Sequence, residues 1–411
     1  MGWSISKISE VTNIISGGTP KSGISDYWFG DVKWITPKDM GKVTDIYVSE
    51  TSRNITQLGL DKSSAKLIPK NSVILSTRAP IGHLAINAVP MATNQGCRGL
   101  VPKSTLDTKF LYYFLLKSVS LLNDLGSGTT FKELSKTVLE KVEIPYPEIS
   151  EQKRIVAILD QAFADIEQAR AKTEKNLKNA RELFESYLQQ VFSLRGEGWV
   201  ESTLGAATGG IYTGPFGSLL HKSDYIENGI PLVNPAHITA LGIEIDNRKT
   251  VSKETAERLS SYIMEKGDVV IGRRGEMGRC ALVTSQESGF LCGTGSFFIK
   301  SSSRCDSGYL VRYLRSASCV ARLEKIAGGA VMPNLSNKDL SNLEIIFPPI
   351  EKQIEILELI DILSAETEKV ALIYQKKLTV LEELKKSILR KAFSGELTKM
   401  LEGETNKGVV A

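Results

Sequence analysis

The sequence predicts an α+β protein: two α+β domains separated by two long helices that form an antiparallel coiled coil, with a pseudo-twofold internal repeat. Two observations predict this fold class. The chain repeats itself once with a period close to 200 residues, and each copy ends in a long stretch that lacks glycine and proline. A repeat of this kind indicates two copies of one structural unit. Each copy therefore has a globular part and a helical tail.

The internal repeat is visible in three pairs of segments. Gly2-Trp3-Ser4 returns as Gly198-Trp199-Val200, and the segment from Leu67 returns from Ile263. The segment from Leu134 returns from Leu335, 201 positions later. At the tryptophans the offset is only 196, from 3 to 199. Loops of different length in two copies of one fold explain this drift.

The tails are predicted to be helices over residues 148–195 and 349–397. Both are rich in Ala, Leu, Glu, Lys, Gln and Arg, which favour helix. Apolar residues recur three and four positions apart in both tails, as at Ile155, Leu159, Ala162 and Ile166 in the first and Ala371, Tyr374, Leu378 and Leu381 in the second. A narrow stripe with this spacing is typical of a coiled-coil seam, so we expect the two helices to pair with each other.

The globular parts are expected at residues 1–147 and 196–348. Short runs such as Ser72–Thr77 and Asp268–Gly272 have the composition of strands and are bounded by glycine or proline nearby. Phe110–Leu116 and Tyr309–Leu314 read as short helices. Residues 398–411 are expected to be a flexible tail.

The composition indicates a cytoplasmic protein with a slight preference for anionic partners. The formal charge is +4 and the pI about 8.6, which favours an anionic partner over a cationic one. The five cysteines are scattered, without a C-x-x-C pair, so we expect reduced thiols and neither disulfides nor a zinc site. No signal peptide and no membrane-length apolar run is apparent.

Motifs for catalysis are not expected in this chain. No phosphate-binding G-x-x-x-x-G-K-[ST] loop occurs. Phe290–Gly295 resembles the turn of an S-adenosylmethionine site, but it leads into a strand-like sequence. Asn234–His237 shares only two letters with the catalytic motif of amino-methyltransferases. The three histidines form no spaced metal-binding pair. We therefore expect no catalytic residue, no metal and no cofactor bound by this chain.

Basic, polar, glycine-containing loops occur in both globular parts and are candidates for contact with DNA. From Pro69 to Lys103 there are four basic residues and no acid. Arginine can bond to both O6 and N7 of guanine, and asparagine or glutamine can bond to both N6 and N7 of adenine. Lysine can bind phosphates. The candidates in the first part are Lys21, Lys38, Arg78, His83, Asn94, Gln95, Arg98 and Lys132, and those in the second are Lys222, His237, Arg273, Arg274, Arg279 and Thr294.

Four motifs give the chain a family resemblance. Gly17–Lys21 and Thr213–Ser218 lie near the start of the two repeats, and Ile144–Val156 and Ile346–Gln353 lead into the long helices. With these motifs the chain resembles type I restriction-modification specificity subunits from Trp3 to about Leu397. It departs from the pattern at three positions. The second copy has Lys352 in place of the usual glutamate and Glu355 after Ile354, and the first copy has Tyr146 in place of a proline.

The resemblance implies that DNA recognition and catalysis are carried out by different subunits. Residues 1–147 and 196–348 would be target-recognition domains that read the two halves of a bipartite double-stranded DNA site. The conserved spacer helices would dock two methyltransferase subunits, which bind S-adenosylmethionine and methylate a flipped adenine. A separate translocase-nuclease subunit would use ATP and Mg. Residues of the helix starts are expected to bind the partner: Gln152, Lys153, Arg154 and Gln353.

Two other classes of function stay open on the residues alone. A DNA methyltransferase would bind S-adenosylmethionine by itself. A protein-only scaffold built on the coiled coil would have no salt-dependent affinity for DNA.

Overall fold

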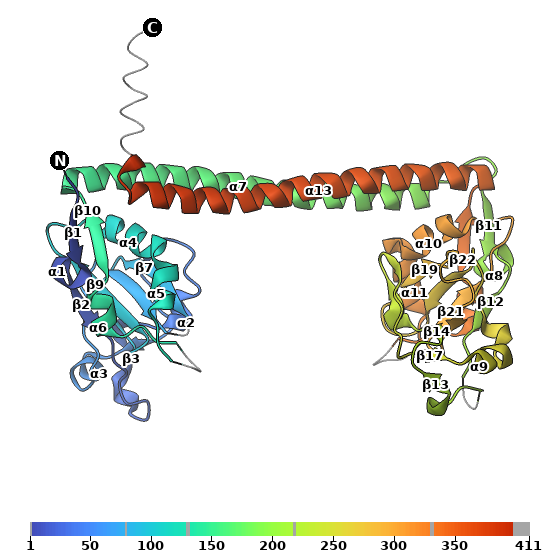
Figure 1. The fold of residues 1–411 in the computed structure, drawn as a ribbon, viewed down its shortest axis with the longest axis horizontal. Coiled ribbons are helices and arrows are strands. Elements are labelled where there is room, and N and C mark those ends of the chain that lie inside the picture. The colour runs from blue at the N-terminus through green and yellow to red at the C-terminus, as the bar shows by residue number, and fades with distance from the viewer. Residues whose placement is uncertain (1, 79, 129–131, 217–218, 329–332, 398–411) are drawn as a thin grey trace, which may run out of the picture. The chain divides into compact units, whose positions relative to one another are not determined.

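The computed structural model describes residues 2–78, 80–128, 132–216, 219–328 and 333–397. The predicted tail at 398–411 lies outside the described residues. The chain divides into two compact units (Figure 1). Unit 1 comprises residues 1–174 and 376–411, and unit 2 comprises residues 175–375. Each long helix therefore contributes one part to each unit.

Unit 1 is built around a five-stranded sheet. Its strand order is β2 (Thr12–Ser16), β9 (Cys97–Pro102), β6 (Val73–Thr77), β7 (Ile81–Asn87) and β4 (Tyr47–Val48). A smaller sheet has the order β5 (Asn54–Ile55), β3 (Trp28–Ile35) and β8 (Met91–Thr93), and a two-stranded ribbon joins β1 (Ser4–Lys7) to β10 (Glu143–Tyr146). Strand β6 is buried along its whole length, which explains its continuous run of apolar and small residues.

Short helices connect and cover these strands in unit 1. They are α1 (Ile8–Val11), η1 (Ser25–Tyr27), α2 (Pro37–Met40), α3 (Gln57–Asp61), α4 (Thr108–Lys117), α5 (Val119–Asp124) and α6 (Lys136–Glu140). Asp107 caps α4 by accepting a hydrogen bond from the backbone N–H of Phe110. Helix α4 buries Phe110 and Phe114 against the sheet and the long helices, so it joins the two layers of the unit.

Unit 2 repeats this plan with its own strands and helices. One sheet has the order β12 (Ile211–Thr213), β21 (Ser296–Ile299), β18 (Val269–Gly272) and β19 (Cys280–Leu282), and a second has β13 (Tyr225–Ile226), β17 (Thr250–Val251), β14 (Ile230–Val233) and β20 (Leu291–Cys292). Ribbons pair β11 (Val200–Thr203) with β22 (Glu344–Phe347) and β15 (Ile238–Thr239) with β16 (Gly242–Ile243). The helices are α8 (Leu204–Ala207), η3 (Lys222–Asp224), η4 (Pro235–His237), α9 (Lys253–Arg258), η5 (Ser260–Tyr262), α10 (Ser307–Arg315), α11 (Ala317–Ile326) and α12 (Asn337–Ser341).

The two long helices are α7 (Ile149–Ser193) and α13 (Ile350–Ala392), and they run antiparallel within each unit. In unit 1, Lys385 pairs with Glu167 at 3.0 Å and Arg170 with Glu382 at 3.3 Å. The helices also pack on the globular part of the same unit. Phe393, just after α13, contacts Phe110 and Phe114 of unit 1, whereas Phe192 of α7 contacts Tyr309 and Tyr313 of unit 2.

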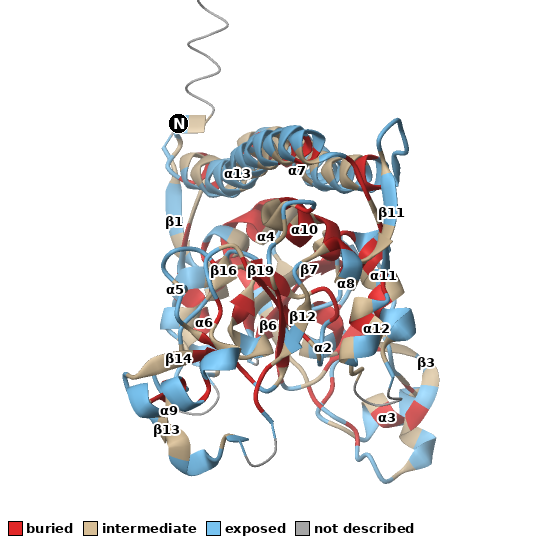
Figure 2. Cartoon of the chain, turned by 90° about the vertical axis from the view of Figure 1, so that its right-hand side faces the viewer, coloured by how far each residue is buried: buried red, intermediate tan, exposed pale blue. Residues whose placement is uncertain are grey.

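Burial is concentrated in the central strands and in the helices that cover them (Figure 2). All five cysteines are buried and free. Burial raises the pKa of the thiols of Cys97 and Cys280 to about 12, so both are protonated at neutral pH. In the part of the chain that the structure describes, no helix is long and apolar enough to cross a membrane.

Candidate nucleic-acid interface

Two turns of unit 1 are fixed side by side by the backbone. Thr77, at the end of β6, donates its N–H to the carbonyl oxygen of Gly96 at 2.8 Å. Its own carbonyl oxygen accepts a bond from the N–H of Leu134, also at 2.8 Å. The turn that starts at Arg78, the turn Asn94–Gly96 and the residues directly before Leu134 therefore lie next to one another.

Arg78 projects from this surface beside an acid. A backbone bridge places Arg78 opposite Glu133, and Nη1 of Arg78 lies 3.8 Å from Oε2 of Glu133. The side chains of Arg78 and Glu133 are 45% and 43% exposed. Lys132, which directly precedes Glu133, is exposed. The arginine is thus accessible, but its charge is partly balanced.

The turn Asn94–Gly96 presents one exposed amide side chain. Oδ1 of Asn94 accepts a bond from the N–H of Gly96 at 2.9 Å, so the asparagine shapes the turn. Gln95 is exposed, and its Oε1 accepts a bond from the hydroxyl of Thr19 at 2.6 Å. A Cβ on Gly96 would lie 2.7 Å from Pro37, which explains the glycine. Gln95 is thus the exposed side chain of this turn.

The remaining candidates of unit 1 differ in accessibility. Lys21 and Lys38 are exposed. His83 is half-buried, and its backbone N–H donates to Oγ of Ser76 at 2.8 Å. Arg98 is also half-buried within β9, where Nη1 donates to Oγ of Ser16 at 2.9 Å and burial lowers the pKa of the guanidinium. Among the described residues its buried Nε has no hydrogen-bond partner.

Unit 2 builds the same frame with different side chains. Arg273 donates its N–H to the carbonyl oxygen of Gly295 at 3.0 Å, and its carbonyl oxygen accepts from the N–H of Leu335 at 2.8 Å. A backbone bridge places Arg274 opposite Asn334. These contacts repeat those of Thr77, Gly96, Leu134, Arg78 and Glu133 in unit 1. Thr294, the counterpart of Gln95, is exposed.

One amide oxygen holds two arginines in unit 2. Oδ1 of Asn334 accepts a bond from Nε of Arg273 and another from Nε of Arg274, each at 3.3 Å. The guanidinium of Arg273 lies over the ring of Phe297, 5.3 Å from its centroid. Burial lowers the pKa of Arg273, and the neighbouring positive charge of Arg274 lowers it further. Arginine remains charged at neutral pH, so this turn carries two positive charges.

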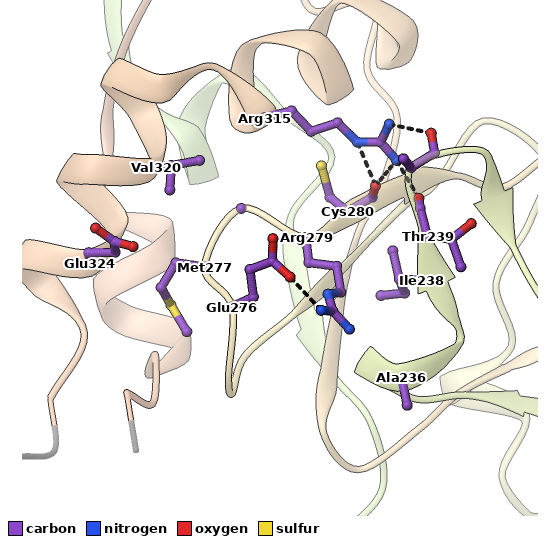
Figure 3. Close-up of a pocket in the computed structure, with 12 residues that line it drawn as sticks. Ala236, Ile238, Thr239, Glu276, Met277, Arg279, Cys280, Arg315, Val320 and Glu324 are labelled. Atoms are coloured by element: carbon purple, nitrogen blue, oxygen red, sulfur yellow. Dashed lines mark hydrogen bonds and ion pairs between the residues drawn. The ribbon is translucent and has the colours of Figure 1, made fainter. Parts of the chain in front are cut away.

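Arg279 lines an open cavity of about 620 Å³ beside this turn (Figure 3). Its guanidinium pairs with Glu276 and donates to the carbonyl oxygen of Pro235 at 3.2 Å. Arg315 lines the same cavity but donates to the carbonyl oxygens of Thr239, Ala240 and Cys280, so it ties the β15–β16 ribbon to α10. The sequence analysis named Arg279 and missed Glu276 and Arg315.

The other two candidates of unit 2 have mainly local contacts. Nδ1 of His237 lies 2.9 Å from the carbonyl oxygen of Leu232, so the ring joins the short helix η4 to β14. Lys222 is exposed in η3. The same short helix is joined to α9 by an ion pair between Asp224 and Arg258, 3.4 Å apart.

The structure corrects the expectation for two of the four partner-binding residues. Gln152 and Gln353 are fully buried. Each accepts a bond from a helix-capping aspartate, Asp107 or Asp306, and donates two bonds to carbonyl oxygens of its own unit. Side chains that are buried and fully bonded have no surface to offer a partner. Lys153 and Arg154 are exposed, and Arg154 pairs with Glu151 at 3.7 Å.

A catalytic constellation is not found in the described residues. Among them, no group of three or more His, Cys, Asp or Glu side chains could hold a metal. The Gly293–Gly295 turn leads from β20 into β21 and not into a helix, so it lacks the geometry of an S-adenosylmethionine cradle. Asn234 is the N-cap of the short helix η4, and Nδ1 of His237 accepts a bond from its backbone N–H at 3.3 Å.

Comparison with known proteins places this fold. The family model for the type I restriction modification DNA specificity domain matches residues 1–176 and 217–379. The chain belongs to the type I restriction-modification DNA specificity family. It is 30% identical to the MjaIX specificity subunit of Methanocaldococcus jannaschii, over 96% of this chain and 93% of that one. It is 22% identical to the EcoKI specificity subunit of Escherichia coli, over 97% and 89%.

Solved structures of this family share the fold. The HsdS subunit from Thermoanaerobacter tengcongensis matches with a TM-score of 0.64 and 20% identity, over 96% of this chain and 97% of that one. A chain from a study of the assembly and conformational transition of the type I R-M system matches with a TM-score of 0.74 and 20% identity, over 96% and 98%. The predicted family, fold class and role in DNA target specificity are thus confirmed.

Proposed function

We propose that this specificity protein reads a bipartite double-stranded DNA target, with one half of the site read by each unit. The observation that carries the proposal is the repeated backbone frame. In unit 1 the backbone of Thr77 bonds to the turn glycine Gly96 and to the buried Leu134. In unit 2 the backbone of Arg273 bonds in the same way to Gly295 and Leu335. Different residues occupy equal places in the turn of this frame: Asn94 and Gln95 in unit 1, Gly293 and Thr294 in unit 2. Equal frames with unequal side chains suit two readers of different base sequences.

We further propose that the chain docks two methyltransferase subunits and leaves catalysis to its partners. S-adenosylmethionine, ATP and Mg would be bound by those partners, and the complex would act in the cytoplasm. The exposed apolar face of α13 in unit 2 supports a docking role, because Leu359, Ile362, Leu372 and Ile373 are 45–65% exposed there. Apolar side chains gathered on one helix are typical of a protein-binding surface. Lys153 and Arg154 would add charged contacts at the start of α7.

Methylome sequencing tests this function directly. The chain is expressed together with the methyltransferase subunits of its own system in cells that lack other modification genes. We expect one split motif, with an unread spacer and methylated adenine in both halves, and no such methylation when the chain is omitted. Methylation that does not depend on the chain, or a contiguous motif, would overturn the proposal.

A further inference from the structure

We propose that the residue opposite the turn arginine, Glu133 in unit 1 and Asn334 in unit 2, sets how much positive charge each unit presents to the DNA backbone. This inference rests on the proposed DNA-reading function. It concerns positioning residues, which act on DNA through the arginines that they hold. The internal repeat provides the comparison, because one position carries a carboxylate in one copy and an amide in the other.

The two positions are equivalent in backbone structure. Glu133 and Arg78 form an isolated bridge, as do Asn334 and Arg274. Each also forms a backbone bridge to a residue six positions earlier, Glu133 to Ser127 and Asn334 to Gly328. The leucine that follows, Leu134 or Leu335, is fully buried. The backbone therefore holds residues 133 and 334 in place whatever their side chains are.

In unit 1 the carboxylate of Glu133 opposes the charge of Arg78. Their separation is 3.8 Å, and both side chains are nearly half exposed. An ion pair with this exposure contributes little to stability, about 0–1 kcal/mol. The carboxylate is therefore not required for folding. A phosphate that approaches Arg78 meets a negative charge at the same place.

In unit 2 the amide of Asn334 orients charge without cancelling it. Its oxygen accepts bonds from both Arg273 and Arg274 and carries no formal charge. Arg273 is also held over the ring of Phe297. Two guanidinium groups that are fixed before binding lose less side-chain entropy when they meet phosphates. Unit 2 thus presents two oriented positive charges where unit 1 presents an ion pair.

Exchanging the two residues tests the inference. The full chain, assembled with its methyltransferase subunits, carries either Glu133→Asn or Asn334→Glu, and binding to the methylome-defined duplex is measured across a salt series. We expect Glu133→Asn to tighten binding roughly fivefold, which is the strength of the interaction between two unit charges about 4 Å apart in water, because Arg78 would no longer share its charge with the carboxylate 3.8 Å away. It should also steepen the slope of log K against log salt by up to about one.

Asn334→Glu should have the opposite effect, with weaker binding and a shallower slope. The recognised bases should not change with either substitution, since phosphate contacts position the protein but carry no sequence information. Glu133→Gln removes the same charge as Glu133→Asn while keeping the side-chain length, so it should also tighten binding. It separates the effect of charge from that of size.

Each matched control makes the same change in net charge as its test variant, at another position of the same unit. Glu174→Gln removes a carboxylate that pairs with Arg170 at 3.0 Å in α7, and Asn179→Glu adds a carboxylate at an exposed position of α7. Both should leave affinity and slope unchanged. If the exchanges behave like these controls while the unmodified complex binds its target in a salt-dependent way, the inference is wrong. If the unmodified complex binds no DNA, the proposed function itself fails.

Discussion

Oε1 of Gln152, in the first turn of α7, accepts a hydrogen bond from the backbone N–H of Asp107 at 2.8 Å. Nε2 of the same glutamine donates to the carbonyl oxygens of Thr105 and Pro147. One buried amide thus fixes the start of the long helix to the start of α4. In unit 2, Gln353 makes the same three bonds to Asp306, Arg304 and Pro348. Each long helix therefore leaves its globular part in an orientation that a buried side chain determines.

Gln152→Ala should lower the free energy of unfolding of unit 1 by about 3 kcal/mol, because three backbone groups, one of them fully buried, would lose the same partner. Chemical denaturation followed by circular dichroism measures this change. Gln161→Ala is the control, since Gln161 is exposed on the same helix and, within the described part of the chain, its side chain bonds to the nearby Asp165 alone. It should change stability by less than about 0.5 kcal/mol. Equal effects of the two substitutions would show that the buried amide is unimportant.

The fold was largely predictable from the sequence because its signals are long and repeated. The 201-residue offset between Leu134 and Leu335 indicates the duplication, and the absence of glycine and proline from residues 148–195 and 350–394 indicates the helices. Gln152 was misjudged because a glutamine at a helix start is usually exposed. Its burial depends on the carbonyl oxygen of Thr105, 47 residues away in the chain. Glu133 and Asn334 were missed for the same reason, since each meets its arginine only across the fold.

Asp39 should give unit 1 an acid-sensitive component of stability. It is buried at the end of the segment Thr36–Asp39, and burial raises its pKa, but hydrogen bonds from Ser52 and Thr36 outweigh this effect and lower it. Because the folded-state pKa lies below the unfolded value of 3.8, this stabilisation is complete above pH 3.8 and is lost as the pH falls through the folded value. Unfolding of Asp39→Asn should depend less on pH below 4. An unaltered pH profile in denaturant titrations would refute this assignment.

The full chain without its partners should bind no S-adenosylmethionine and should not methylate DNA. The turn Gly293–Gly295 joins two strands, and its glycine at 293 packs against the side chain of Asn234, so it leaves no helix N-terminus for a cofactor. Titration calorimetry with S-adenosylmethionine measures the binding. The complex with methyltransferase subunits is the positive control. Saturable binding by the chain alone would favour a methyltransferase and contradict the non-catalytic role.

Substitutions in the two turns should alter different halves of the DNA target. Arg78→Ala removes a side chain of unit 1, and Arg273→Ala removes one of unit 2. Loss of a contact to a base should cost about 1–3 kcal/mol and relax the preference at that position, whereas loss of a phosphate contact should weaken binding to all sequences alike. Binding to libraries with one half randomised at a time distinguishes these results. If both variants changed preference at the same base pairs, the assignment of one half-site to each unit would be wrong.

The length of α7 and α13 should determine the number of unread base pairs between the half-sites. Seven residues added after Glu174 and seven after Gln375 keep the apolar seam in register and lengthen each helix by about 10 Å, at 1.5 Å per residue. That length corresponds to about three base pairs of DNA, at 3.4 Å per base pair. No candidate contact residue changes, so the same bases should be read with a longer spacer. Methylome sequencing of the double insertion measures the spacer.

The control is a single insertion, in α7 alone. Pairs such as Lys385 with Glu167 and Phe393 with Phe110 fix the end of α13 on unit 1. Lengthening one helix therefore puts the antiparallel helices out of register, and it should abolish methylation. An active double insertion with the original spacer would show that the helices do not set this distance.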